Sequence, residues 1–102
     1  SDAAAALKAQ LLLADAAGYV AACHAVANVD WQAGLAAVHT PALVLAGALD
    51  QGATVAMAED LASRIAGAEL QVFEAASHLS VEEEPDRFHD AVAAFLARLP
   101  AK

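Results

Sequence analysis

Cysteine and positive charge are both scarce in this sequence. A single cysteine, Cys23, cannot form an internal disulfide, which agrees with a reducing compartment. Five basic residues stand against thirteen acidic ones, and the net charge is −8. Because a surface of this sign repels a phosphate backbone, the composition argues against nucleic acid as a partner.

Long hydrophobic runs are also missing, although 60% of the 102 residues are hydrophobic. No run approaches the roughly 18 residues that a membrane-spanning helix needs. Residues 1–10 carry neither the basic segment nor the cleavage pattern of a signal peptide. We therefore expect a soluble, cytoplasmic protein without a membrane partner, whose apolar residues form the core of one small domain.

The first third of the chain has a helical pattern. Residues 2–28 are rich in alanine, with larger apolar side chains at helical spacing, which predicts two helices. Asp15 is suited to cap the second helix, because a short carboxylate accepts hydrogen bonds from the free amides of a first turn. A short helical turn is predicted over 31–38, and Pro41 ends helical structure.

The middle of the chain predicts a strand, a helix and a second strand. Residues 42–46 are uninterruptedly apolar, which is typical of a strand buried on both faces. An amphipathic helix follows, with Thr54 as its N-cap and Gly67 as its stop. The alternating segment 69–73 predicts the second strand. A crossover helix of this length makes the two strands parallel.

The last predicted element is a helix from Pro85 to about Leu99. Only two strands are then available, which is too few to bury a strand on both faces and leaves a sheet that is marginal in water. The sequence therefore predicts an α/β fold that is incomplete on its own. It is either one end of a larger sheet or one of two pieces that assemble.

Two residues suited to acid–base chemistry follow the two predicted strands. Asp50 comes after the first strand and His78 after the second. Because parallel strands end at the same edge of a sheet, we expect the two residues to meet there. A carboxylate beside an imidazole fixes its tautomer and stabilises the imidazolium that forms when the ring takes a proton. The plainer interpretation is a turn aspartate and a loop histidine.

Three segments of the chain resemble a known family. They are TPALVLAGALD, then ASRIAGAELQVFEAASHLSVEEEPDRF, then a helix that ends in FLARL, and they resemble the C-terminal part of α/β-hydrolases. With DAAGYVAACHAVANVD ahead of them, the chain resembles in particular the 3-oxoadipate enol-lactonases of the β-ketoadipate pathway of aromatic catabolism. The resemblance covers almost the whole chain.

This resemblance implies a hydrolase of carboxylic esters or lactones that acts on 3-oxoadipate enol-lactone without a cofactor. It implies Asp50 as the acid and His78 as the base of a catalytic triad. Residues 1–30 would be the last helices of the cap, and 31–102 the C-terminal part of the core. No serine here stands in the G-x-S-x-G turn that presents a nucleophile. We therefore expect the chain to be inactive alone and to need the N-terminal part of the fold or a self-association partner.

A few other side chains are candidates for a binding or metal site. Tyr19 and Trp31 are candidates for lining a substrate pocket beneath the cap, and their alternative role is packing between helices. The remaining histidines have no partner at metal-ligand spacing, so no metal site is predicted; they are His24, His39 and His89. The three acids at 82–84 are favourable against the dipole of the last helix and are expected to be solvated.

Two alternatives to the enol-lactonase interpretation stay open. The first is a free-standing, mostly helical module that binds a partner or a second copy through apolar surface, without catalysis. The second keeps the fold and changes the chemistry, as in related esterases, haloperoxidases and carbon–carbon hydrolases. Size-exclusion chromatography distinguishes the first alternative from part of a hydrolase. A self-sufficient module elutes as one defined species, whereas an incomplete hydrolase aggregates or needs its missing part.

Overall fold

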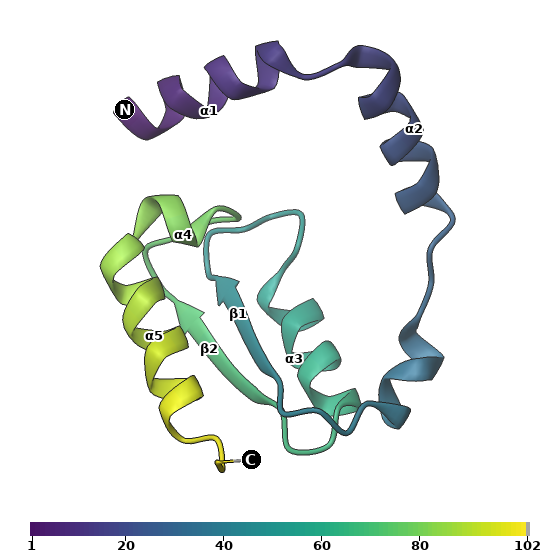
Figure 1. Cartoon of the computed structure of the whole chain (residues 1–102), viewed down its shortest axis with the longest axis vertical. Helices are drawn as coiled ribbons and strands as arrows, with labels where there is room; N and C mark the ends of the chain where they lie inside the picture. Colours follow the sequence, from purple (N-terminus) through teal and green to yellow (C-terminus); the bar gives the residue numbers. More distant parts are fainter. Residues whose placement is uncertain (102) are drawn as a thin grey trace. The chain divides into compact units, whose positions relative to one another are not determined.

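The computed structural model describes residues 1–101, which divide into a first unit, Ser1–Trp31, and a second unit that begins at Gln32 (Figure 1). The predicted assignment of residues 1–30 to a cap and of the rest to a core stays a prediction, because a division into compact units does not identify either one.

The first unit contains the two predicted helices, α1 (Asp2–Leu13) and α2 (Ala16–Ala27). Asp15 caps α2 as predicted, since its carboxylate accepts a hydrogen bond of 2.8 Å from the backbone N–H of Gly18. Neither helix contains a buried residue. Among the described residues no single helix passes a length and hydropathy test for a membrane span, and α1 and α2 pass it only as a pair bent by 100°.

The second unit contains the predicted strand–helix–strand arrangement. Its elements, in chain order, are η1 (Gln32–Ala37, a 3-10 helix), β1 (Leu43–Gly47), α3 (Val55–Arg64), β2 (Glu69–Phe73), α4 (Ser80–Glu83) and α5 (Pro85–Ala97). The two strands are parallel, and Leu43 pairs with Glu69 at one end and Gly47 with Phe73 at the other. The short α4 was not predicted.

The limits of α3 follow from local signals in the sequence. The Thr54 hydroxyl accepts a hydrogen bond of 3.3 Å from the N–H of Met57 and so caps the first turn. After the helix, Gly67 adopts a φ of +74°, a left-handed conformation that glycine takes without steric cost. Both roles agree with the prediction.

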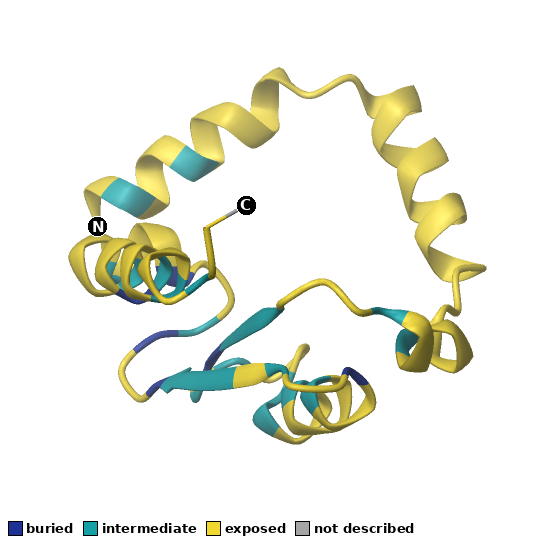
Figure 2. Cartoon of the chain, turned by 60° about the horizontal axis from the view of Figure 1, so that its bottom comes forward, coloured by how far each residue is buried: buried dark blue, intermediate teal, exposed yellow. Residues whose placement is uncertain are grey.

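Helices α3 and α5 lie on opposite faces of the small sheet (Figures 1 and 2). The core lies between the sheet and α5, where Phe73 and Ala76 are fully buried and Ala91 is nearly so. The Phe73 ring meets Phe88 of α5 edge to face, with the ring centroids 6.4 Å apart. This contact fixes the end of β2 from which the chain continues toward His78.

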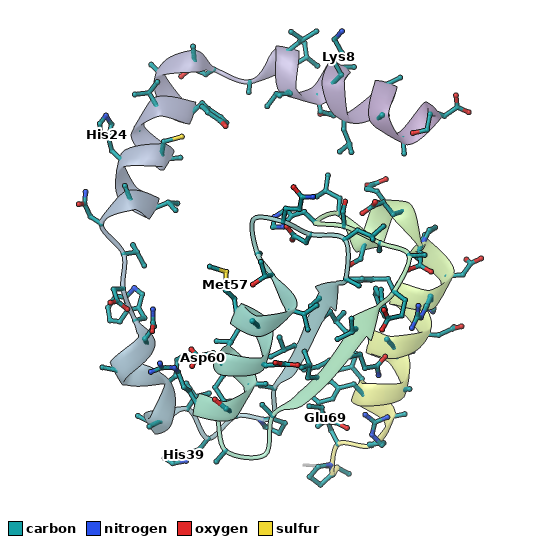
Figure 3. All side chains as sticks on the ribbon, turned by 180° about the vertical axis from the view of Figure 1, so that it is seen from behind. Lys8, His24, His39, Met57, Asp60 and Glu69 are labelled. Atoms are coloured by element: carbon teal, nitrogen blue, oxygen red, sulfur yellow. The ribbon has the colours of Figure 1, made fainter. Side chains whose placement is uncertain are left out.

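Two arginines attach α5 to β2. Arg98 forms an ion pair of 2.7 Å with Glu69 at the start of the strand (Figure 3). Arg87 donates to the carbonyl of Val72 at 3.2 Å, and its guanidinium lies 4.7 Å from the centre of the Phe73 ring. The strand is therefore held at both ends by the helix that covers it.

The burial of β1 differs from the prediction. Ala46 and Gly47 are buried, but Leu43, Val44 and Leu45 are only half-buried. The reason is that β1 has a single neighbour, β2, in the part of the chain that is described. The apolar composition of residues 42–46 thus fits a strand inside a wider sheet better than the two-stranded sheet that is present.

Candidate active site

Asp50 is fixed in the turn that follows β1. Its backbone N–H donates to the carbonyl of Gly47 at 3.1 Å. One carboxylate oxygen, Oδ1, accepts hydrogen bonds from the backbone N–H groups of Gly52 at 2.9 Å and Ala53 at 3.0 Å. Asp50 therefore does act as a turn residue, as the plainer interpretation held, but this occupies only one of its two oxygens.

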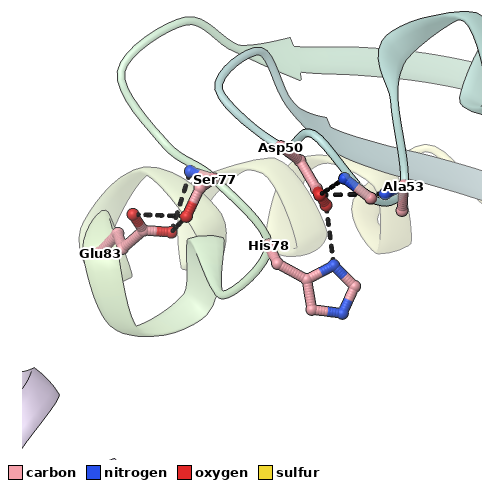
Figure 4. A network of polar contacts seen from close by, with 6 residues as sticks. Asp50, Ala53, Ser77, His78 and Glu83 are labelled. Carbon is pink, nitrogen blue, oxygen red and sulfur yellow. Dashed lines mark hydrogen bonds and ion pairs between the residues drawn. The ribbon is translucent and has the colours of Figure 1, made fainter.

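The second oxygen of Asp50 faces His78. Oδ2 lies 2.7 Å from Nδ1 of the His78 ring, across the edge where β1 and β2 end (Figure 4). The Asp50 side chain is 9% exposed and the His78 side chain is 72% exposed. The carboxylate thus fixes one ring nitrogen, and the other, Nε2, points away from it toward solvent (Figure 4). The predicted meeting of the two residues is observed; their catalytic role stays a prediction.

The electrostatics of the pair favour an ionised Asp50. The hydrogen bond from His78 is the largest cause that lowers the pKa of this carboxyl group, and the N–H groups of Ala53 and Gly52 lower that pKa further. Partial desolvation acts in the opposite direction but does not outweigh these hydrogen bonds. The carboxylate is therefore negative at neutral pH and ready to stabilise a positive imidazolium.

An open cavity of about 230 Å³ lies beside the pair. Asp50 and His78 line it together with Ser80, and most of its other lining residues are apolar: Val44, Ala46, Met57, Ala58 and Leu61. An apolar cavity with a few convergent polar groups is the usual form of a small-molecule site.

Glu83 is a residue of the site that the sequence interpretation missed. Its carboxylate accepts a hydrogen bond of 2.9 Å from the backbone N–H of Ser77 and one of 3.0 Å from the Ser77 hydroxyl (Figure 4). Glu82 and Glu83 are exposed, as expected, and Glu84 is half-buried; the hydrogen bonds of Glu83 with Ser77 are what the sequence does not indicate. The three consecutive glutamates are visible in the sequence. The contact of Glu83 with Ser77, however, depends on how the loop after β2 turns back onto α4.

The two candidates for substrate binding, Tyr19 and Trp31, belong to the first unit, whereas the pair belongs to the second. Tyr19 lies on α2 and Trp31 follows it, and both are exposed. His24 projects from α2 and His39 follows η1 (Figure 3). No group of three or more metal-ligating side chains occurs within residues 1–101. The substrate-binding roles of Tyr19 and Trp31 stay predictions.

Comparison with known proteins gives relatives but no matching family model. The chain is 41% identical to 3-oxoadipate enol-lactonase 2 of Acinetobacter baylyi over 83 residues, a match that covers 81% of this chain and 31% of that protein. A second enol-lactonase of the same organism is 36% identical. The chain thus spans about 30% of the length of the curated relatives it matches.

Solved structures of enzymes are also similar to this chain. The enol-lactonase from Burkholderia xenovorans LB400 matches 79% of the chain with a TM-score of 0.77 and 37% identity, and the match covers 31% of that structure. A hydrolase from Pseudomonas aeruginosa PA01 matches 68% of the chain with a TM-score of 0.64 and 42% identity, and the match covers 26% of that structure.

Proposed function

Because this chain carries part of an α/β-hydrolase fold and is related to 3-oxoadipate enol-lactonases, we propose that the protein hydrolyses carboxylic ester or lactone bonds. We assign the triad acid to Asp50 and the triad base to His78. The observation that carries this assignment is the 2.7 Å contact between Asp50 Oδ2 and His78 Nδ1, which leaves Nε2 exposed.

The proposed reaction uses His78 first as a base and then as an acid. Nε2 accepts the proton of a serine hydroxyl or a water as its oxygen attacks the carbonyl carbon of the substrate. The Asp50 carboxylate stabilises the resulting imidazolium. The ring then gives the proton to the leaving oxygen as the bond from that oxygen to the carbonyl carbon breaks. In a lactone this oxygen stays attached to the acyl group. With a serine nucleophile a second round follows, in which His78 takes a proton from water as the water attacks the acyl-enzyme, and returns it to the serine oxygen as the acid product leaves.

The nucleophile in this proposal comes from outside the 102 residues. Of the serines near the pair, Ser77 donates its hydroxyl to Glu83, and Ser80 is 8% exposed. Neither stands in a G-x-S-x-G turn. We expect the remaining part of the hydrolase fold to supply the nucleophile and the donors that stabilise the oxyanion.

For the substrate we propose 3-oxoadipate enol-lactone. Its support is the name of the two curated relatives and of one solved relative, an enol-lactonase. The cavity beside His78 is mainly apolar, a lining that suits other small esters as well. Comparing kcat/KM for the enol-lactone with that for p-nitrophenyl acetate in the complete protein tests this choice, and a clear preference for the simple ester would contradict it.

The direct test of the assignment is His78→Ala in the complete protein. We expect kcat to fall by roughly 10⁴- to 10⁶-fold, as for other triad bases, while the protein stays folded at the assay temperature. His89→Ala is the matched control, because His89 is an exposed histidine on α5. Hydrolysis at the wild-type rate in His78→Ala would overturn the proposed function.

One observation favours the second candidate, a binding module without catalysis. Large apolar side chains are exposed in the first unit, among them Leu12 at 76%, Leu13 at 81% and Val26 at 74%. Single exposed apolar residues are ordinary, but a group of this kind is typical of a surface that another chain segment covers. A single defined species of this chain in size-exclusion chromatography, with no hydrolysis by the complete protein, would support this candidate.

A further inference from the structure

The loop that carries His78 is held at three consecutive residues by two segments of the chain, the turn after β1 and α4. The carbonyl of Ala76 accepts a hydrogen bond of 3.0 Å from the N–H of Leu49, in the turn after β1. The next residue, Ser77, is bound by Glu83 at the end of α4. The third residue is His78, whose ring meets Asp50.

Glu83 binds both donors that Ser77 offers. The backbone N–H lies 2.9 Å from Oε2, and the hydroxyl lies 3.0 Å from Oε1 and 3.1 Å from Oε2. Hydrogen bonds to an ionised carboxylate are stronger than neutral ones, and two of them fix the direction of the peptide as well as its position. Figure 4 shows Glu83 and Asp50 reaching the neighbouring residues Ser77 and His78 from different segments of the chain.

Without Glu83, little in the described structure restrains the direction of the His78 side chain on its solvent side. His78 is 72% exposed, so packing does not fix its ring. Rotation about the backbone bonds of Ser77 swings the Cα–Cβ bond of His78, and a displacement of about 1 Å at a catalytic group lowers reaction rates strongly. The hydrogen bond from Leu49 to Ala76 and the contact of Asp50 with the His78 ring lie on either side of Ser77 and leave that rotation available, because each is a single hydrogen bond that acts as a pivot.

We propose that Glu83 is a positioning residue for His78, acting through Ser77. The inference rests on the proposed function, since it assumes that His78 is the base. Glu83 touches neither substrate nor His78 in this assignment. Its carboxylate holds the N–H of the Ala76–Ser77 peptide and the Ser77 hydroxyl, and so fixes the residue before His78 such that Nε2 stays in the direction of the nucleophile.

The test compares Glu83→Met and Glu83→Gln in the complete protein. Methionine keeps the length of the side chain and removes both acceptors, and we expect kcat to fall about ten-fold with KM unchanged. Glutamine offers one acceptor to the Ser77 N–H and one donor to its hydroxyl, so kcat should recover to within about two-fold of wild type. Glu82→Met is the matched control, because Glu82 is an exposed neighbour on the same helix, and its kcat should not change.

A spectroscopic readout separates positioning from general stability. The Nδ1–H proton of His78 in its hydrogen bond with Asp50 should give a downfield NMR resonance in the wild type and in Glu83→Gln. That resonance should broaden or vanish in Glu83→Met at a temperature where the protein is fully folded. If Glu83→Met does not fold, Ser77→Ala decides instead, and we expect its kcat to fall about two- to five-fold because only the hydroxyl contact is lost.

The two proposals fail in different ways. Wild-type kcat in Glu83→Met, together with loss of hydrolysis in His78→Ala, would overturn the role of Glu83 and leave the proposed function standing. A Glu83→Gln variant as slow as Glu83→Met, or a Ser77→Ala variant at the wild-type rate, would also overturn it. Full hydrolysis in His78→Ala would overturn the proposed function and, with it, the positioning role.

Discussion

The two oxygens of the Asp50 carboxylate have different partners. Oδ1 accepts the turn amides of Gly52 and Ala53, and Oδ2 lies 2.7 Å from the His78 ring. The turn therefore holds the carboxylate rigid independently of the contact with His78. This division of contacts makes Asp50 a better orienting group than a carboxylate on a freely rotating side chain, because less conformational entropy is lost when the imidazolium forms.

A prediction at this scale concerns the pKa of Asp50. Its largest cause of lowering is the hydrogen bond with His78, so His78→Ala should raise the pKa of Asp50 toward the ordinary aspartate value. A pH titration of the Asp50 carboxyl carbon by NMR measures this directly. An Asp50 midpoint that is the same in His78→Ala as in the wild type would contradict the account.

The same lowered pKa links Asp50 to stability. Because its pKa is lower in the folded chain than in the unfolded one, the ionised carboxylate stabilises the fold above the unfolded pKa, which is about 3.9. That contribution is lost as the pH falls through the lower, folded pKa. Asp50→Asn should therefore reduce the free energy of unfolding at pH 7, and the difference from wild type should shrink in acid below about pH 4.

At the scale of elements, the close approach between the end of β1 and the loop after β2 requires a glycine at position 47. A Cβ atom at Gly47 would clash with the carbonyl oxygens of Ala76 and Ser77. Glycine therefore permits the close approach of the loop to the strand, and the hydrogen bond from Leu49 to Ala76 follows from it. The position of His78 thus depends on packing between two backbones as well as on its own side chain.

Gly47→Ala should destabilise the complete protein by roughly 1–3 kcal/mol, because either β1 or the loop must move. Chemical denaturation measures this change. Gly34→Ala is the matched control, since no heavy atom lies within 4 Å of the Cβ position there. We also expect kcat to fall in Gly47→Ala, and equal stability of the two variants would contradict the close approach.

Most helices and strands of the chain were predictable because their signals are local. Thr54 and Asp15 cap their helices as their short polar side chains indicate, and the alternating segment 69–73 forms the second strand. The meeting of Asp50 and His78 was predictable too, because the order of parallel strands dictates which loops share an edge. These inferences need only chain order and periodicity.

What could not be predicted depends on tertiary contacts. The role of Glu83 requires the loop after β2 to return the Ser77 peptide to α4, and no periodicity encodes that path. The half-burial of Leu43 to Leu45 depends on how many strands flank β1, which its apolar composition does not reveal. Residues 42–46 have the composition of a wider sheet than the one that this chain forms.

At the scale of the whole molecule, the chain spans about 30% of the curated relatives it matches, and the open edge of β1 and the exposed apolar residues of α1 and α2 agree with a larger assembly. A two-stranded parallel sheet is marginal in water on its own. The chemistry at Asp50 and His78 also needs a nucleophile from elsewhere. The structure and the proposed chemistry thus both require a further part of the hydrolase fold.

We predict that the isolated 102-residue chain does not hydrolyse esters and associates or aggregates in size-exclusion chromatography, because its apolar surface stays uncovered. The complete protein should elute as a defined species and be active. The control is the complete protein with His78→Ala, which should elute like the wild type and be inactive. Ester hydrolysis by the isolated, monomeric chain would contradict the proposed source of the nucleophile.

The most direct test of the central claim, that Asp50 acts through His78, is a double-mutant cycle in the complete protein. We would measure kcat for Asp50→Asn, His78→Ala and the double variant on the same ester. If Asp50 works by orienting His78, Asp50→Asn should lower kcat by about 10²- to 10⁴-fold in the wild-type background and have almost no effect once His78 is gone. An Asp50→Asn effect of the same size in both backgrounds would contradict the account, because the two residues would then act independently.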